Sequence, residues 1–223
     1  MQVETTPAFQ GRKTARQSSE QRRIAILQAA LRVLVRDGVR GVRHRAVATE
    51  AGVPLSATTY YFKDIHDLLA DALTLFASDM VQNFVEPFWS QAYEWIRAYP
   101  PETRDNAEEM SRIIDHMTTV GSEYLLARVR DHRQQLILEQ AFWYAALTDE
   151  RMHGIALQHS RRLLQSFIGI LEYFGVAEVE QAAKSFFTTV RGLEYEGLVG
   201  SPDFTPEKVR AAIRYKIRVV MSV

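Results

Sequence analysis

The sequence predicts an all-α protein. Apolar residues recur at spacings of three and four through most of the chain, and no stretch alternates at every second residue between hairpin turns. With 223 residues, 47% of them apolar, the chain is long enough to bury a core in one large domain or two small ones. No internal repeat or low-complexity segment interrupts the pattern.

Three helices are predicted near the N-terminus, after a flexible basic tail over residues 1–17. Ser18 and Gln21 fit a capping box for the first helix, which Asp37-Gly38 ends. A short second helix runs from about 43 to 50. Gly52 favours the left-handed backbone conformation that ends it, and Pro54 suits the first turn of a third helix, which ends near residue 62.

The rest of the chain is predicted to be helical. Asp64 is a candidate N-cap for a fourth helix, which Pro87 kinks or ends, and Pro100-Pro101 marks a loop. Five further helices are expected at about 103–118, 122–147, 149–174, 178–199 and 206–221. We therefore expect a tail at 1–17, a small three-helix domain at 18–66 and a larger helical domain at 67–223.

Several classes of function find no support in the composition. The chain has no Cys, which excludes disulfides, a thiol nucleophile and Cys-bound metals. The six His lack metal-ligand spacing, and a single Glu-x-x-His at Glu150 and His153 is half of what a helical di-iron site needs. We expect no catalytic residues, no metal and no cofactor. With no candidate membrane span and no apolar signal-peptide core, a cytoplasmic chain is expected.

The formal charge of zero conceals a split. Residues 1–66 hold eleven Lys and Arg against five Asp and Glu, a net charge of +6, which leaves −6 for the remainder. A basic end joined to an acidic body is typical of a protein that uses that end on a polyanion such as DNA. A solvated basic face would give the same count, so charge alone leaves both interpretations open.

The segment 43–62 carries the most specific signal. Two short helices joined by Ala51-Gly52-Val53 have the layout of a helix-turn-helix, whose second helix enters the major groove of DNA. That second helix has adjacent Thr and adjacent Tyr, which are poor helix formers but present hydroxyls and methyls to a partner. The alternative interpretation is a purely structural three-helix unit with those side chains exposed.

This segment resembles the DNA-binding signature of the TetR family of bacterial transcriptional regulators. The resemblance rests on Arg45-Ala-Val-Ala-Thr-Glu-Ala-Gly-Val53, on Pro54-Leu-Ser-Ala-Thr-Thr-Tyr-Tyr-Phe62 and on Leu68-Leu69, and it is specific over residues 20–70. The chain departs from the family pattern where relatives carry a capping Thr, a capping Ser, a Gly and a phosphate-contacting Lys, at Arg43, Pro54, Ser56 and Ile65. Lys63 is the candidate replacement for that Lys.

The resemblance implies a homodimer on a palindromic operator in double-stranded DNA, with the two recognition helices one helical turn apart. We expect base-edge contacts from Ser56, Ala57, Thr58 and Tyr60, and phosphate contacts from Arg43, His44, Arg45, Thr59, Tyr61 and Lys63. In the tail, Arg12, Lys13 and Arg16 either enter the minor groove or only aid solubility.

The resemblance also implies a dimer through the last pair of long helices and a small-molecule effector in the body. The predicted dimer interface is Leu163, Phe167, Leu171, Phe174, Phe186, Val190 and Leu193. The predicted effector-lining residues are Phe76, Met80, Phe84, Met110, Met117, Phe142, Trp143 and Tyr144, with His116 and Glu139 as polar anchors. An aromatic and Met stripe at helical spacing is also what an ordinary core produces.

Taken together, these patterns favour a dimeric transcriptional regulator, by analogy a repressor released by a small apolar effector. The alternative is a helical small-molecule-binding protein or enzyme whose basic end is incidental. The two differ in whether the chain binds DNA with steep salt dependence.

Overall fold

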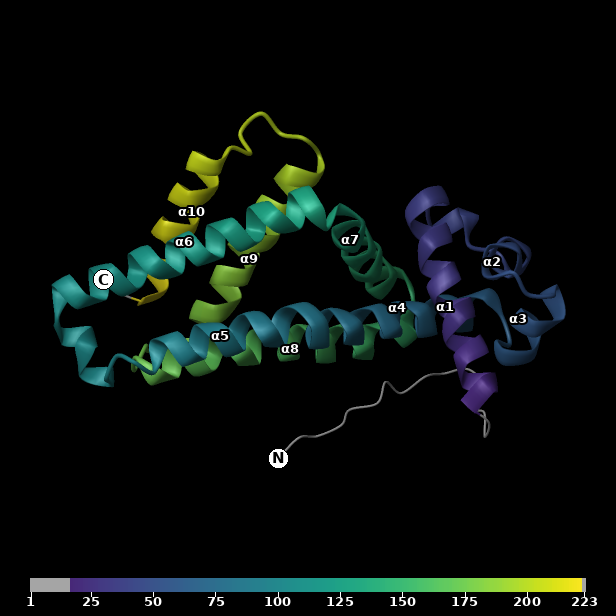
Figure 1. Cartoon of the computed structure of the whole chain (residues 1–223), viewed down its shortest axis with the longest axis horizontal. Coiled ribbons are helices and arrows are strands. Elements are labelled where there is room, and N and C mark those ends of the chain that lie inside the picture. Colours follow the sequence, from purple (N-terminus) through teal and green to yellow (C-terminus); the bar gives the residue numbers. More distant parts are fainter. Residues whose placement is uncertain (1–16, 222–223) are drawn as a thin grey trace. The chain divides into compact units, whose positions relative to one another are not determined.

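The computed structural model describes residues 17–221, and within that range its regular secondary structure is all helical (Figure 1). The predicted tail at 1–17, with its proposed minor-groove arm, therefore lies outside the described residues apart from Gln17. The α-helices are α1 (Gln17–Asp37), α2 (His44–Ala51), α3 (Leu55–Tyr61), α4 (Ile65–Met80), α5 (Glu86–Ile96), α6 (Ala107–Asp131), α7 (Arg133–Thr148), α8 (Glu150–Tyr173), α9 (Val179–Leu198) and α10 (Pro206–Met221).

The chain divides into two compact units, which we describe separately. The first comprises Met1–Gln82 with Ile137–His159, and the second comprises Asn83–Leu136 with Ser160–Val223. Because α4 packs along α1, the first unit extends beyond residue 66, where the sequence pattern placed the end of the DNA-binding domain. None of the helices in the described chain is both long and apolar enough to span a membrane.

In the first unit, α1 packs against both α2 and α4 (Figure 1). Its inward face buries an apolar stripe, Ile26, Leu27, Ala30, Val33 and Leu34. Gly52 ends α2 with φ 65° and ψ 31°, the left-handed conformation that glycine adopts without steric cost. Asp64 caps α4 as expected: its carboxylate accepts hydrogen bonds from the backbone N–H groups of His66 and Asp67, at 2.8 and 2.9 Å.

A π-helical turn, Val81–Val85, connects α4 to α5, and Pro87 lies in the first turn of α5. Proline fits this place because the first turn of a helix has no intrahelical partner for its N–H group. The prediction that Pro87 ends or kinks the fourth helix is wrong in position, because α4 passes into the π turn at Val81 and Pro87 lies within α5.

The core of the second unit is formed chiefly by α6, α8, α9 and α10, and Figure 1 shows α10 lying along α6. The predicted interruption between 118 and 122 is wrong, because α6 runs through Gly121 to Asp131 and ends at His132 instead. A glycine within a helix costs about 1 kcal/mol, and here α10 packs against it: a Cβ at Gly121 would stand 3.6 Å from the Ile213 side chain.

Candidate nucleic-acid interface

Two ion pairs connect α2 to α1. Glu50 on α2 accepts hydrogen bonds from Arg32 and Arg36 on α1, each at 2.8 Å. These two guanidinium groups, Arg32 first, hold the pKa of the Glu50 carboxyl below its usual range. The charges of Arg32 and Arg36 are therefore engaged within the unit, and the cations for a partner must come from elsewhere.

Other cations cluster where α2 begins. Arg43, the N-cap residue, and Arg45 in the first turn are exposed, and His44 between them is half-buried. Lys63, just beyond α3, is exposed as well. The N-terminal turn of a helix also presents unpaired backbone N–H groups, which favour an anion. The structure thus leaves Arg43, Arg45 and Lys63 accessible, as contact with phosphate requires, and His44 only in part.

The structure corrects two of the predicted contacts on α3. Thr58 is 0% exposed, and its hydroxyl donates to the Leu55 carbonyl at 2.8 Å, so it has no surface to offer a base. Tyr61 is 4% exposed, and its hydroxyl lies 2.8 Å from the Ser19 hydroxyl of α1, so it anchors α3 and does not face a phosphate. Both point inward because a helix of seven residues must bury one face to stay docked.

The outward face of α3 consists of Leu55, Ser56, Thr59 and Tyr60, with Ala57 half-buried beside them. Leu55 was missing from the sequence prediction although it is 42% exposed. The signal that could have identified it is the spacing: Leu55 lies one helical turn before Thr59, which was predicted to face DNA. This face is held outward by the buried side, where Tyr61 and Phe62 pack against the unit.

A buried ion pair holds α1 and α4 together behind α3. Arg23 of α1 and Asp71 of α4 approach to 2.6 Å, and both are almost fully buried. The Arg23 guanidinium also lies 5.7 Å from the ring centroid of Phe62, the residue that follows α3. This pair therefore supports the end of α3 from beneath.

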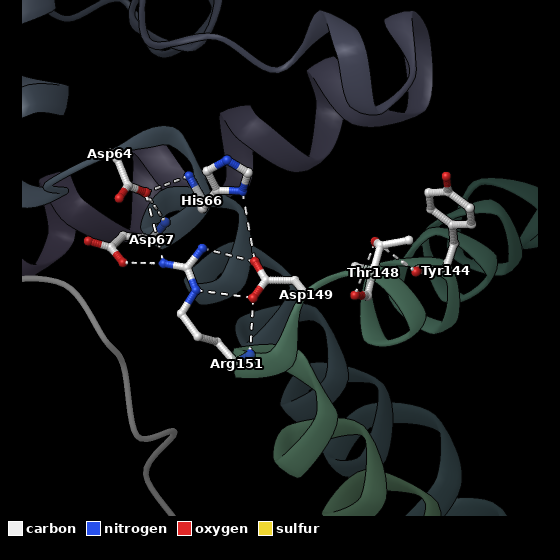
Figure 2. A network of polar contacts seen from close by, with 8 residues as sticks. Asp64, His66, Asp67, Tyr144, Thr148, Asp149 and Arg151 are labelled. Carbon is white, nitrogen blue, oxygen red and sulfur yellow. Dashed lines mark hydrogen bonds and ion pairs between the residues drawn. The ribbon is translucent and has the colours of Figure 1, made fainter.

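A second ionic network ties the start of α8 to the start of α4 (Figure 2). Arg151 donates to Asp67 at 2.8 Å and to both oxygens of Asp149, at 2.9 and 3.1 Å. Asp64, which caps α4, lies 3.9 Å from the same guanidinium, and the His66 ring lies 3.8 Å from Asp149. The Arg151 hydrogen bond lowers the pKa of the Asp149 carboxyl, while the backbone N–H of Asp67 does most to lower that of Asp64. We call this group the Arg151 clamp.

Comparison with known families identifies the chain. The model for the tetracyclin repressor-like C-terminal domain matches residues 102–219, more than half of the sequence. The chain belongs to the TetR family. No curated protein shows significant sequence similarity to it.

Solved structures of other TetR-family and related regulators have the same fold. A transcriptional regulator from Rhodococcus sp. Rha1 is 21% identical with a TM-score of 0.67, the match covering 90% of this chain and 96% of that one. A TetR-family member from Streptomyces coelicolor A3 is 23% identical with a TM-score of 0.57, over 88% and 98% of the two chains. The multidrug-binding protein EbrR, solved with proflavin, is 24% identical with a TM-score of 0.54, over 87% and 99%.

The effector-lining residues predicted for this TetR-family chain are divided between the two units. Phe76, Met80, Glu139, Phe142, Trp143 and Tyr144 belong to the first unit, whereas Phe84, Met110, His116 and Met117 belong to the second. Tyr144 is 58% exposed and points away from the Arg151 clamp in Figure 2, so its expected place in an enclosed pocket is wrong. His116 is exposed and stacks on Trp95 at 3.8 Å between ring centroids, and Met110 is core.

One set of these residues does combine aromatic and polar groups. Phe142, Trp143 and His159 form a cluster with ring centroids 5.2–5.9 Å apart, where α7 meets the first turns of α8. His159 and Glu139 of α7 are both buried. Sequence analysis missed His159 because a lone histidine on an apolar helix has no motif, and only its distance from the two α7 rings marks it.

The predicted dimer interface is largely wrong. Phe167 is 1% exposed and packs between Trp89 and Phe186 within the second unit, at 5.3 and 4.5 Å between ring centroids. The other buried members of that stripe are Leu163, Leu171, Phe174 and Phe186. Val190 and Leu193 are half-buried against the same core. Phe167 and its neighbours fill the core of the protomer, because the α8 and α9 faces that they share point at each other and at α5.

Proposed function

We propose that this chain is a sequence-specific DNA-binding transcriptional repressor that acts as a homodimer on a palindromic operator. The observation that carries the proposal is the outward face of α3, with exposed Arg43 and Arg45 before it in the chain, exposed Lys63 after it, and Tyr61 anchored to α1 on its inner side. A short helix with a groove-facing surface and cations on either side fits a major groove and its two phosphate backbones.

The dimer surface that we now propose is the exposed side of α8 and α9. Tyr195 and Val199 are exposed there, Gly192 has open space where a side chain would stand, and Leu164 and Ile168 are half-buried. A glycine facing open space lets a second helix approach closely. A symmetric pair of such surfaces would place two α3 helices in one particle.

DNA binding is tested by salt-dependent gel-shift titration against random-sequence duplex and against sites selected from a random pool. The affinity should fall with a log-log slope near −0.9 for each phosphate neutralised, and Arg43→Gln or Lys63→Gln should each reduce that slope by about one. Tyr60→Ala should abolish selection, whereas Tyr144→Ala, an equally exposed tyrosine on α7, should leave it intact. Failure of the wild-type protein to bind any duplex at low salt would refute the proposal.

We further propose that a small apolar effector binds beside the Phe142, Trp143 and His159 cluster and releases the operator. Aromatic walls with few buried polar groups, here Glu139 and His159, are typical of small-molecule sites. The Arg151 clamp would then connect α8 to the first turn of α4, three residues beyond α3. An effector needs a differential affinity of only about 1–3 kcal/mol between two states to change DNA binding 5- to 150-fold.

Proflavin, the ligand solved with EbrR, is a suitable first probe. Because a planar dye also binds the duplex, the titration is done without DNA, by quenching of protein fluorescence in wild type and Trp143→Phe. Binding should slow or accelerate amide exchange in the first turn of α4, and Arg151→Gln should remove that response while Arg130→Gln, an exposed arginine on α6, keeps it. An unchanged response in Arg151→Gln would refute the role of the clamp.

A further inference from the structure

The outward face of α3 lacks the side chains that usually read guanine and adenine. Residues 55–61 contain no Arg, Lys, Asn or Gln. Bidentate hydrogen bonds to guanine come from Arg or Lys, and those to adenine come from Asn or Gln. This helix therefore has no bidentate contact to guanine or adenine, and direct readout is left to its hydroxyl and apolar groups.

The hydroxyl groups of the helix are also partly committed. Thr59 donates its hydroxyl proton to the Ser56 carbonyl at 3.3 Å, and Thr58 is buried and bonded to Leu55. Thr59 therefore has no hydroxyl proton left to donate to a base, but its methyl group remains available for an apolar contact. Leu55, 42% exposed in the first turn, presents only hydrocarbon.

Tyr60 adds a large ring that is held in place. It is 56% exposed, and its ring meets that of Tyr61 edge-to-face, with 5.1 Å between centroids. Tyr61 is in turn fixed through its hydroxyl to Ser19. A braced ring loses little conformational entropy when a partner covers it.

In the major groove, the one apolar group on the edge of a base pair is the C5 methyl of thymine. We propose that α3 selects its operator half-site through thymine methyl groups, with Leu55 as the residue that contacts them. This inference rests on the proposed DNA-binding function and adds to it the chemistry of selection. Any bidentate hydrogen bonds to guanine or adenine would then come from residues outside α3.

The test replaces each thymine of a selected operator, in both half-sites at once, by deoxyuridine. Deoxyuridine lacks only the methyl and keeps the pairing edge, so any loss of affinity reports the methyl contact alone. For at least one position we expect a loss of about fourfold per half-site, roughly tenfold or more for the dimer, as burial of one methyl group predicts. Affinities are measured by fluorescence anisotropy at fixed salt.

Variants assign the contact to its residue. Leu55→Ala should bind the two operators equally, because the methyl has lost its apolar partner, and the conservative Leu55→Met should retain discrimination. Leu147→Ala, which truncates the exposed Leu147 on α7, is the matched control and should retain it fully. Circular dichroism confirms that each variant is folded.

The outcomes separate the inference from the function beneath it. Salt-dependent, sequence-selective binding that is indifferent to every thymine methyl would overturn the inference and leave the proposed function standing. Discrimination that survives in Leu55→Ala would overturn the assignment to Leu55. An absence of any selected duplex would count against the proposed function itself.

Discussion

Breaking the buried ion pair between Arg23 and Asp71 should destabilise the DNA-binding unit severely. Arg23→Met keeps most of the side-chain volume but leaves the Asp71 carboxylate, which is 0% exposed, without its guanidinium partner at 2.6 Å. Removing one member of a buried ion pair costs about 3–5 kcal/mol. This is a large share of the free energy of unfolding of a typical domain, which is about 5–15 kcal/mol. With a urea m-value of about 2–3 kcal/mol/M, the unfolding midpoint should fall by about 1–2 M.

The assay is urea unfolding followed by far-ultraviolet circular dichroism, at one protein concentration because dimerisation shifts apparent stability. The double variant Arg23→Met with Asp71→Leu removes both charges, so it should recover most of the loss or exceed the wild type. Arg32→Met, on the exposed side of the same helix, is the control: an exposed ion pair contributes at most about 1 kcal/mol, so the midpoint should fall by less than about 0.5 M. A midpoint for Arg23→Met within error of the wild type, or a double variant as unstable as the single one, would refute the argument.

Three further predictions follow from the structure. Asp149 has a folded-state pKa below its usual 3.8. Its ionised carboxylate therefore contributes its full stability above pH 3.8 and loses it as the pH falls through the folded-state value. Asp149→Asn should make the urea midpoint depend less on pH in this acidic range. Thr58→Val should cost about 1 kcal/mol in urea unfolding yet keep operator selection in a gel shift, because its hydroxyl bonds within the helix. Phe167→Ala truncates a core side chain and should cost about 3–5 kcal/mol in urea unfolding. Tyr195→Asp should shift sedimentation toward monomer while the protomer stays folded. The reverse pattern would restore Phe167 and its neighbours as the dimer interface.

Local sequence signals predicted the elements around α3 well. Gly52 and Asp64 each act through backbone chemistry that operates within a few residues, and the structure shows both where the sequence placed them. The break expected between 118 and 122 is absent because α6 packs along α10, where Gly121 faces Ile213, and a local signal does not contain such distant contacts.

The orientation of side chains was harder to predict than the elements themselves. On a helix as short as α3, a face is defined by only two turns, so the sequence could not decide whether Thr58 or Leu55 points outward. On α8 and α9, apolar periodicity marks burial but not the partner, and Phe167 is equally suited to a core or an interface. Only the packing of Trp89 and Phe186 around Phe167 shows that this residue belongs to the core of the protomer and not to an interface.

Hydroxyl-radical footprinting of the protein on a selected operator tests the central claim most directly. Two copies of α3 in one dimer should protect two symmetric patches about 10 base pairs, or about 34–36 Å, apart on one side of the duplex, with the selected sequence palindromic about their midpoint. Tyr60→Ala should remove both patches together. A single asymmetric patch, or protection that is the same on every sequence, would contradict the account.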